Sequence, residues 1–193
     1  MPKNELDRPA KAFVVGLAGP SGTGKSTVAR QIAFRLNGHA ISMETYSTCD
    51  PTLSFEERSR LNYDEPSAID LPLLDGHIRR YAAGFPIESP VYDFGHHLRL
   101  DRTIHVEPKP LLIVEGILAL HFAELRPHYQ LSICLEAPDE TCYRRRPVRD
   151  ITERQRTLDL IRWQYETTVL PAARKYCRRA SATPTSSSTP LPL

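Results

Sequence analysis

Short apolar runs recur along the chain, and longer stretches of mixed polar and apolar residues separate them. Four runs rich in Val, Ile and Leu predict buried β-strands, at residues 13–18, 39–42, 111–114 and 131–135. Three of the mixed stretches predict helices, at residues 26–36, 54–61 and 69–83, and the last of these ends before Gly84. This alternation predicts an α/β sandwich around a mostly parallel sheet.

Two further segments interrupt the alternation. Residues 86–106 combine strand-forming and turn-forming residues, so we expect a β-hairpin insert that projects from the main sheet. Residues 138–176 have a helical pattern, which we expect to break near Pro147. No internal repeat is visible in the sequence.

The composition of the 193 residues fits one soluble globular domain. We place it at residues 12–180, between a polar tail at 1–11 and a Ser/Pro-rich tail at 181–193 that we expect to be disordered. The apolar runs are too short to span a bilayer and the first residues hold no apolar signal core, so we expect a cytoplasmic protein. Four widely spaced cysteines without a CxxC pair favour reduced thiols. The net charge of +2 is too small to suggest a nucleic-acid binder.

A complete Walker A phosphate loop follows the first predicted strand. Glycines in such a loop let backbone N–H groups surround phosphate oxygens, and the N-terminus of the following helix adds a positive dipole end. We expect Lys25 to reach the β- and γ-phosphates of a nucleoside triphosphate, and Ser26 to ligate Mg²⁺. The predicted nucleotide-binding residues are Gly19, Pro20, Ser21, Gly22, Thr23, Gly24, Lys25, Ser26 and Thr27.

Two acidic residues follow predicted strands. Glu115 ends the run at 111–114, where a Walker B carboxylate stands, so we expect it near Ser26 as a second Mg²⁺ ligand. Glu44 emerges after the strand at 39–42 at the same edge of the sheet. It could accept the proton of an alcohol acceptor during phosphoryl transfer, or it could be an exposed loop acid.

Arginines are concentrated between residues 144 and 156. Such a group forms either a solvated helix face or a clamp for phosphate. A phosphate loop elsewhere in the chain favours a mobile arginine lid, because guanidinium groups match the charge that develops during phosphoryl transfer. A nucleic-acid site would interleave aromatic residues, and Tyr143 is the only one in this segment. The cluster comprises Arg144, Arg145, Arg146, Arg149, Arg154 and Arg156.

Five segments in this order resemble the uridine kinase (uridine–cytidine kinase) family: residues 19–26, 61–70, 90–94, 114–120 and 149–154. The Val-Tyr-Asp-Phe and Glu-Gly-Ile-Leu-Ala pieces are more specific than the phosphate loop, which many families share. The resemblance implies a three-layer P-loop NTPase sandwich with a β-hairpin and a helical arginine lid. It also implies transfer of the γ-phosphoryl group of ATP or GTP, with Mg²⁺, to the ribose 5′-hydroxyl of uridine or cytidine in pyrimidine salvage.

The resemblance assigns roles by position. Asp64 matches the acid that holds the ribose hydroxyls, Tyr92 and Phe94 match aromatics against the pyrimidine, and His97 matches the histidine at the base edge. The lid and nucleoside-site arginines match Arg146, Arg149, Arg154 and Arg156, and a nucleoside-contacting glutamine matches Gln164. The expected catalytic residues are Lys25, Glu44, Arg149 and Arg154. Alternatively, Tyr92 or Phe94 is a core residue, His96 exchanges roles with His97, and Gln164 is an ordinary helix residue.

The sequence departs from the family pattern in two places. The family usually has Asp where this chain has Glu44, and the extra methylene adds about 1.5 Å of reach. The family also continues after its long helix into another strand and a loop near the adenine, whereas residues 178–180 lead into the Ser/Pro tail. We therefore expect weaker or less selective nucleotide binding and an exposed sheet edge that favours association. The resemblance itself suggests a homo-oligomer.

Two other functions remain open. A phosphoribulokinase shares the phosphate loop and phosphorylates a sugar phosphate, although the Val-Tyr-Asp-Phe element and His97 favour an acceptor with a base. A catalytically weak, nucleotide-binding regulatory protein derived from such a kinase would be consistent with Glu44 and the altered C-terminus.

Overall fold

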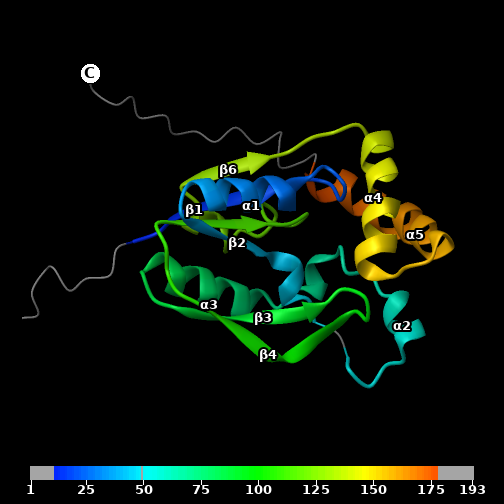
Figure 1. Cartoon of the computed structure of the whole chain (residues 1–193), viewed down its shortest axis with the longest axis horizontal. Helices are drawn as coiled ribbons and strands as arrows, with labels where there is room; N and C mark the ends of the chain where they lie inside the picture. Colours follow the sequence, from blue (N-terminus) through cyan, green and yellow to red (C-terminus); the bar gives the residue numbers. More distant parts are fainter. Residues whose placement is uncertain (1–10, 49, 178–193) are drawn as a thin grey trace, which may run out of the picture.

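The computed structural model describes residues 11–48 and 50–177. Strands and helices alternate from the start of the chain (Figure 1). The strands are β1 (Phe13–Ala18), β2 (Gly38–Ser42), β3 (Ile87–Asp93), β4 (Leu98–Val106), β5 (Leu111–Glu115) and β6 (Leu131–Cys134). The helices are α1 (Lys25–Arg35), α2 (Phe55–Ser59), α3 (Leu71–Ala82), α4 (Asp139–Arg154), α5 (Leu158–Gln164) and α6 (Leu170–Ala172). Two π-helical turns, Tyr165–Val169 and Ala173–Cys177, flank α6.

Four strands form a parallel sheet in the order β2-β5-β1-β6. The predicted parallel α/β sheet is therefore confirmed, and each of its strands lies within one residue of the predicted bounds. Glu115 pairs in register with Leu17 on one side and with Ser42 on the other. The carboxyl ends of β1, β2 and β5 consequently meet at one edge, where doubly wound sheets bind ligands.

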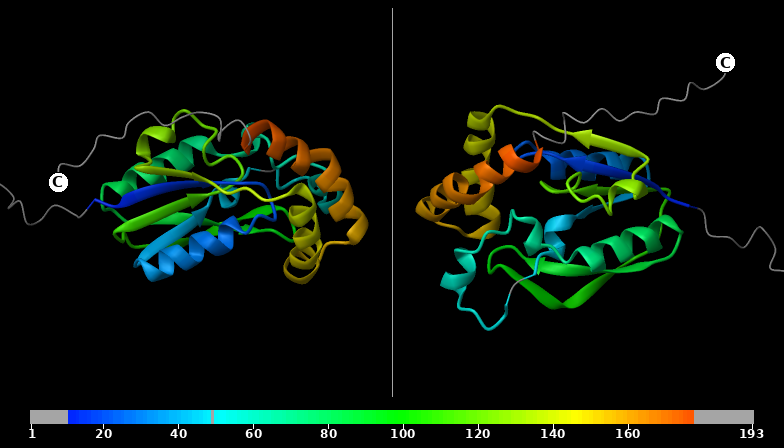
Figure 2. Two further views of the ribbon diagram at one scale, coloured as in Figure 1. Left: turned by 90° about the horizontal axis from the view of Figure 1, so that it is seen from above. Right: turned by 180° about the vertical axis from the view of Figure 1, so that it is seen from behind.

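The strands alternate their side chains between two helical layers. Val15, Leu17 and Ile113 face α1, where they pack around Ala29 and Ala33. The opposite face, which includes Val14, Leu112 and Val114, packs against α3 and the C-terminal helical segment. The two views in Figure 2 show α1 and α3 on opposite faces of the sheet. This arrangement is the three-layer sandwich that the resemblance implied, and it follows from the period-two alternation of strands.

The predicted hairpin is confirmed as a separate two-stranded antiparallel sheet. β3 and β4 pair from Ile87 with Val106 to Asp93 with Leu98, with a register shift between Pro90 and Tyr92. A proline cannot donate to a strand ladder, which explains why an irregularity occurs at this position. α3 packs beside β3 (Figure 1), so the hairpin is tied to the main domain.

The expected break near Pro147 is wrong, because α4 continues through this residue to Arg154. The ring removes one backbone donor, and the buried side chains of Arg146 and Asp150 on either side of Pro147 hold the helix in place. The helix ends instead at Gln155, which has φ 54° and donates its N–H to the Asp150 carbonyl. Thr157 then caps α5 by accepting from the N–H of Leu160.

Among residues 11–48 and 50–177, no helix is both long and apolar enough to cross a membrane. The predicted tail at 181–193 and the altered segment 178–180 lie outside the described residues, as does all of the predicted N-terminal tail except Lys11.

Candidate active site

The phosphate loop joins β1 to α1 and leaves the start of that helix without a side-chain cap. Gly24 occupies the N-cap position with φ 96°, and Gly22 has φ 91°, a left-handed conformation that favours glycine. A Cβ on Gly22 would collide with the carbonyl of Cys142, so α4 rests directly on the loop. Uncapped N–H groups at a helix start form an anion site, and the loop therefore presents one.

Lys25 and Glu115 lie buried at the carboxyl edge of the sheet, each 4% exposed. Burial raises the pKa of the Glu115 carboxyl, and the negative charge of Glu44 raises it further. The charge of Lys25 and hydrogen bonds from the Ser26 and Ser42 hydroxyls lower this pKa, but the net shift is upward. The Oε2 atom of Glu115 has no hydrogen-bond partner among the described residues. A buried, unpaired carboxylate oxygen beside a serine hydroxyl fits a hard divalent cation such as Mg²⁺.

Glu44 lies two residues beyond the end of β2, in a 3₁₀ turn, Met43–Tyr46. Its Oε2 is 3.7 Å from an Arg154 guanidinium nitrogen. Burial raises the pKa of Glu44, but Lys25, Arg154, Arg149 and Arg146 outweigh burial, and the net shift is downward. The Glu44 carboxylate is thus ionised and able to accept a proton.

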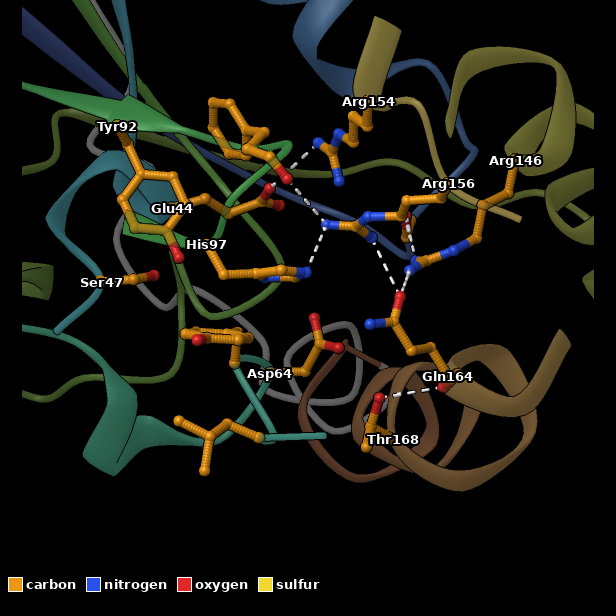
Figure 3. Close-up of a pocket in the computed structure, with 14 residues that line it drawn as sticks. Glu44, Ser47, Asp64, Tyr92, His97, Arg146, Arg154, Arg156, Gln164 and Thr168 are labelled. Atoms are coloured by element: carbon orange, nitrogen blue, oxygen red, sulfur yellow. Dashed lines mark hydrogen bonds and ion pairs between the residues drawn. The ribbon is translucent and has the colours of Figure 1, made fainter. Parts of the chain in front are cut away.

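A cavity, which we call the acceptor cavity, opens beside Glu44 (Figure 3). Tyr92 and Phe94 line the cavity with their ring centroids 5.0 Å apart, and Tyr63 stacks on His97 at 4.8 Å with an interplanar angle of 15°. The cavity therefore offers aromatic surfaces to a flat ligand.

His97, which is 4% exposed, lies in this cavity, whereas its neighbour His96 is exposed and pairs with Asp93 at 2.9 Å. Burial and then the charge of Arg156 lower the pKa of His97 to about 3. Arg156 Nη2 lies 3.1 Å from His97 Nε2 and donates to it, so in the neutral ring Nδ1 carries the proton. His97 therefore presents a fixed tautomer over the whole neutral pH range.

Asp64 points into the centre of the cavity, between His97 and Gln164 (Figure 3). Burial raises the pKa of the Asp64 carboxyl above its ordinary value. The positive charge of Arg146 lowers this pKa and the negative charge of Glu44 raises it, and the net shift is upward. A carboxylate in this position can accept hydrogen bonds from paired hydroxyl groups of a ligand.

Five arginines of the predicted cluster line the site: Arg145, Arg146, Arg149 and Arg154 from α4, and Arg156 from the turn after it. Arg146 Nη1 donates to the Ser21 hydroxyl at 3.1 Å, and Arg149 Nη2 donates to the same oxygen at 3.4 Å. The Arg154 guanidinium lies 4.7 Å from the centre of the Phe94 ring.

Arg156 lines the acceptor cavity together with Arg146 and Arg154. It donates to the Gln164 Oε1 atom at 3.0 Å and to the Phe94 carbonyl at 3.1 Å. Gln164 in turn donates to the Ser59 carbonyl at 3.1 Å. The lid therefore contacts both the phosphate loop and the acceptor cavity.

The acceptor cavity continues toward the phosphate loop through two further cavities. The first shares Glu44, Phe94 and Arg154 with it and also contains Ser26 and Glu115. The second shares Ser26 and Arg149 with the first and is lined by the loop residues Gly22, Gly24, Lys25, Ser26 and Thr27. The structure thus brings the predicted phosphate, metal and acceptor residues into one continuous site.

Three predicted loop residues lie apart from these cavities. Pro20 borders a separate cavity with Cys134 and Cys177. Gly19 packs against Leu135, and the Thr23 hydroxyl donates to the Pro20 carbonyl at 2.9 Å, which closes the loop.

Several lining residues were not predicted from the sequence. Tyr63, Ser47, Leu61 and Thr168 line the acceptor cavity. Tyr63 lies directly before Asp64 in a segment already singled out, and this proximity is the one signal that could have identified it. Asp150, which contacts the lid arginines, lies within the family-like segment 149–154, and the sequence predicted no role for it.

Comparison with known proteins gives a consistent result. The model of the phosphoribulokinase/uridine kinase family matches residues 14–185. A uridine kinase of Lactobacillus helveticus is 39% identical over 165 residues, which are 83% of this chain and 78% of the relative. A uridine kinase of Klebsiella pneumoniae is 40% identical over 172 residues, 86% of this chain and 81% of the relative. The solved D-glycerate 3-kinase of Cryptococcus neoformans superposes with a TM-score of 0.61 at 13% identity, covering 95% of this chain and 85% of that one.

Proposed function

Because the chain belongs to the phosphoribulokinase/uridine kinase family, and is therefore a kinase, we propose that it phosphorylates the 5′-hydroxyl of uridine or cytidine. ATP or GTP supplies the γ-phosphoryl group, and the products are UMP or CMP, as in pyrimidine salvage. The observation that carries this proposal is the acceptor cavity, in which a neutral, fixed His97 and an aromatic lining lie next to an ionised Glu44.

The acceptor cavity matches the two parts of a nucleoside. Tyr92 and Phe94 offer faces and edges to the pyrimidine, and the Nδ1–H of His97 can donate to an acceptor on the edge of the base. Asp64 is placed to accept hydrogen bonds from the ribose diol. A sugar phosphate has no base to occupy the aromatic part of the cavity, which disfavours the phosphoribulokinase alternative.

The remaining residues serve the transfer step. The uncapped start of α1 and Lys25 hold the phosphates, and Arg149 and Arg154 lie where they can stabilise the negative charge that develops on the transferred group. Ser26 and Glu115 would hold Mg²⁺, which neutralises phosphate charge when it is bound. Glu44 accepts the proton of the 5′-hydroxyl and orients its oxygen for attack.

The proposal includes small-molecule partners rather than nucleic acid, and it retains the cytoplasmic location expected from the sequence. It also retains a homo-oligomer, as the family resemblance suggests.

A coupled assay with Mg-ATP and a panel of uridine, cytidine and ribulose 5-phosphate tests the proposal. We expect turnover of uridine or cytidine, with Lys25→Ala as the blank. His97→Gln should raise the KM for the nucleoside by about 10-fold or more, since a buried hydrogen-bond partner is lost. The matched control His96→Gln changes an exposed neighbour and should leave the KM unchanged. Turnover of ribulose 5-phosphate alone would contradict the proposal.

A further inference from the structure

Asp150 is a buried carboxylate that lines none of the cavities of the site. It is 0% exposed and lies on α4, behind the arginines of the lid. Its Oδ1 is 2.8 Å from Arg149 Nε and Nη2 and 3.6 Å from Arg154 Nε. Its Oδ2 is 3.2 Å from Arg146 Nε and 3.4 Å from Arg156 Nη1. One carboxylate therefore contacts four of the arginines that line the cavities.

These arginines leave Asp150 in different directions. Arg146 and Arg149 reach Ser21 in the phosphate loop. Arg154 reaches Glu44, and Arg156 reaches the ring of His97. The loop is thus connected to Asp150 through two guanidinium groups, and the candidate base and the acceptor cavity are connected to it through one each.

The arginines repel one another, so a counter-charge is needed to keep them together. Burial and then repulsion by Arg154 lower the pKa of Arg156 to about 10. Burial likewise lowers the pKa of Arg154, Arg149 lowers it further, and Glu44 and Asp150 oppose this. Burial raises the pKa of Asp150, but Arg149, Arg146 and Arg154 outweigh burial and hold it below its ordinary range. The carboxylate is ionised and acts as the common anion of the group.

We infer that Asp150 is a positioning residue: through its four guanidinium contacts it fixes the lid arginines at the places where they serve phosphoryl transfer. This inference rests on the proposed function. It concerns a residue that touches neither the nucleotide nor the acceptor and acts only through others. The arginine most tightly held is Arg149, because two of its nitrogens lie 2.8 Å from one carboxylate oxygen.

A purely structural role is the competing explanation. The Asp150 backbone carbonyl accepts the N–H groups of Gln155 and Arg156 and so ends α4. If Asp150 were only structural, removal of its side-chain charge would break the buried ion pairs and lower the stability of the fold. The molecules that remain folded would keep the wild-type kinetic constants. The kinetic constants of folded protein distinguish the two explanations.

The test uses Asp150→Asn, which keeps the size of the side chain and removes its charge. Positioning predicts that kcat for uridine falls by about 100-fold, because alignment of reacting groups is lost. The KM for Mg-ATP should change by less than about 10-fold, since interactions specific to the transition state affect kcat rather than KM. Asp159→Asn, the same change at an exposed site on α5, is the matched control and should leave both constants unchanged.

A double-mutant cycle with Arg149→Gln tests whether Asp150 acts through its arginines. If it does, Asp150→Asn should lower kcat much less in the Arg149→Gln background than in the wild type. If the two substitutions instead lower kcat by the full product of their separate effects, the inference is overturned.

Asp150→Glu is the second variant, for use if Asp150→Asn does not fold. It keeps the negative charge but displaces it, so the arginines are misaligned and kcat should fall at least 10-fold. A wild-type kcat in either variant would overturn the inference.

The wild-type control in the same assay distinguishes a failure of the Asp150 inference from a failure of the proposed function. Wild-type turnover of uridine together with an unchanged Asp150→Asn variant overturns the role of Asp150 and leaves the proposed function intact. No wild-type turnover of any nucleoside overturns the proposed function, and the inference with it.

Discussion

Glu44 provides the sharpest prediction, because its backbone position is fixed on both sides. The side chain of Met43 fills the space beside Gly116, where even a Cβ would collide with it. Tyr46 is 0% exposed, and its hydroxyl lies 3.0 Å from His77 Nδ1. The 3₁₀ turn that carries Glu44 therefore cannot shift to compensate for a shorter or neutral side chain.

The geometry gives the size of the effect for two substitutions. Glu44→Asp withdraws the carboxylate by about 1.5 Å, which breaks an Arg154 contact that already spans 3.7 Å. A displacement of this size should lower kcat by about 100-fold. Glu44→Gln keeps the length but removes the proton acceptor, and loss of a general base costs roughly 100- to 10,000-fold in kcat.

Steady-state turnover of uridine with saturating Mg-ATP measures both variants. Glu56→Gln, in an exposed pair with Arg60 on α2, is the matched control and should keep the wild-type kcat. A Glu44→Gln variant that retains wild-type turnover would refute the role of Glu44 as base. A Glu44→Asp variant that is faster than the wild type would show that the native glutamate is a damaged base, and would favour a regulatory function.

Three other predictions concern the fold and the metal. Since the pKa of folded His97 is about 3, the unfolded state binds a proton that the folded state rejects, and stability should fall by about 1.4 kcal/mol per pH unit below pH 6.5. Urea unfolding at pH 7 and pH 5 checks this, and an equal pH dependence in His97→Gln would contradict it. Gly22→Ala places a methyl group at a residue with positive φ and against the Cys142 carbonyl. The Kd for ATP, measured by calorimetry, should therefore rise by about 10-fold or more. Gly76→Ala is the control, because the space around Gly76 is open, and its Kd should equal that of the wild type. Glu115→Gln should raise the Mg²⁺ concentration needed for half-maximal turnover by about 10-fold, and an unchanged Mg²⁺ titration would exclude Glu115 as a ligand.

The parallel sheet could be predicted from the sequence because β1 and β5 carry apolar runs that are buried. The phosphate loop could be placed for the same reason, since the run at Phe13–Ala18 precedes it. The prediction that 131–135 is a buried strand was wrong in its burial, because β6 lies at the edge of the sheet and Leu131 is exposed. The break near Pro147 was wrong because local propensity ignores tertiary contacts: buried Arg146 and Asp150 hold α4 together across the proline. The left-handed Gln155 that does end the helix has no proline or glycine to signal it.

The site itself could be predicted only where a motif fixes a residue. Glu44 and Asp64 are twenty residues apart, and only the folded chain brings both to the wall of one cavity. Choosing between His96 and His97 required the backbone, because φ 55° at His97 sends the two side chains to different surroundings. Asp150 could not be predicted at all, since its role depends on four arginines meeting one buried carboxylate.

Identification of the phosphorylated product tests the central claim most directly. The protein is incubated with Mg²⁺ and γ-labelled ATP, with uridine in one reaction and 5′-deoxyuridine, which lacks the accepting hydroxyl, in another. The account predicts labelled 5′-UMP from uridine, no product from 5′-deoxyuridine, and no product with Lys25→Ala. Label transferred to ribulose 5-phosphate but not to uridine or cytidine, or to no acceptor at all, would contradict it.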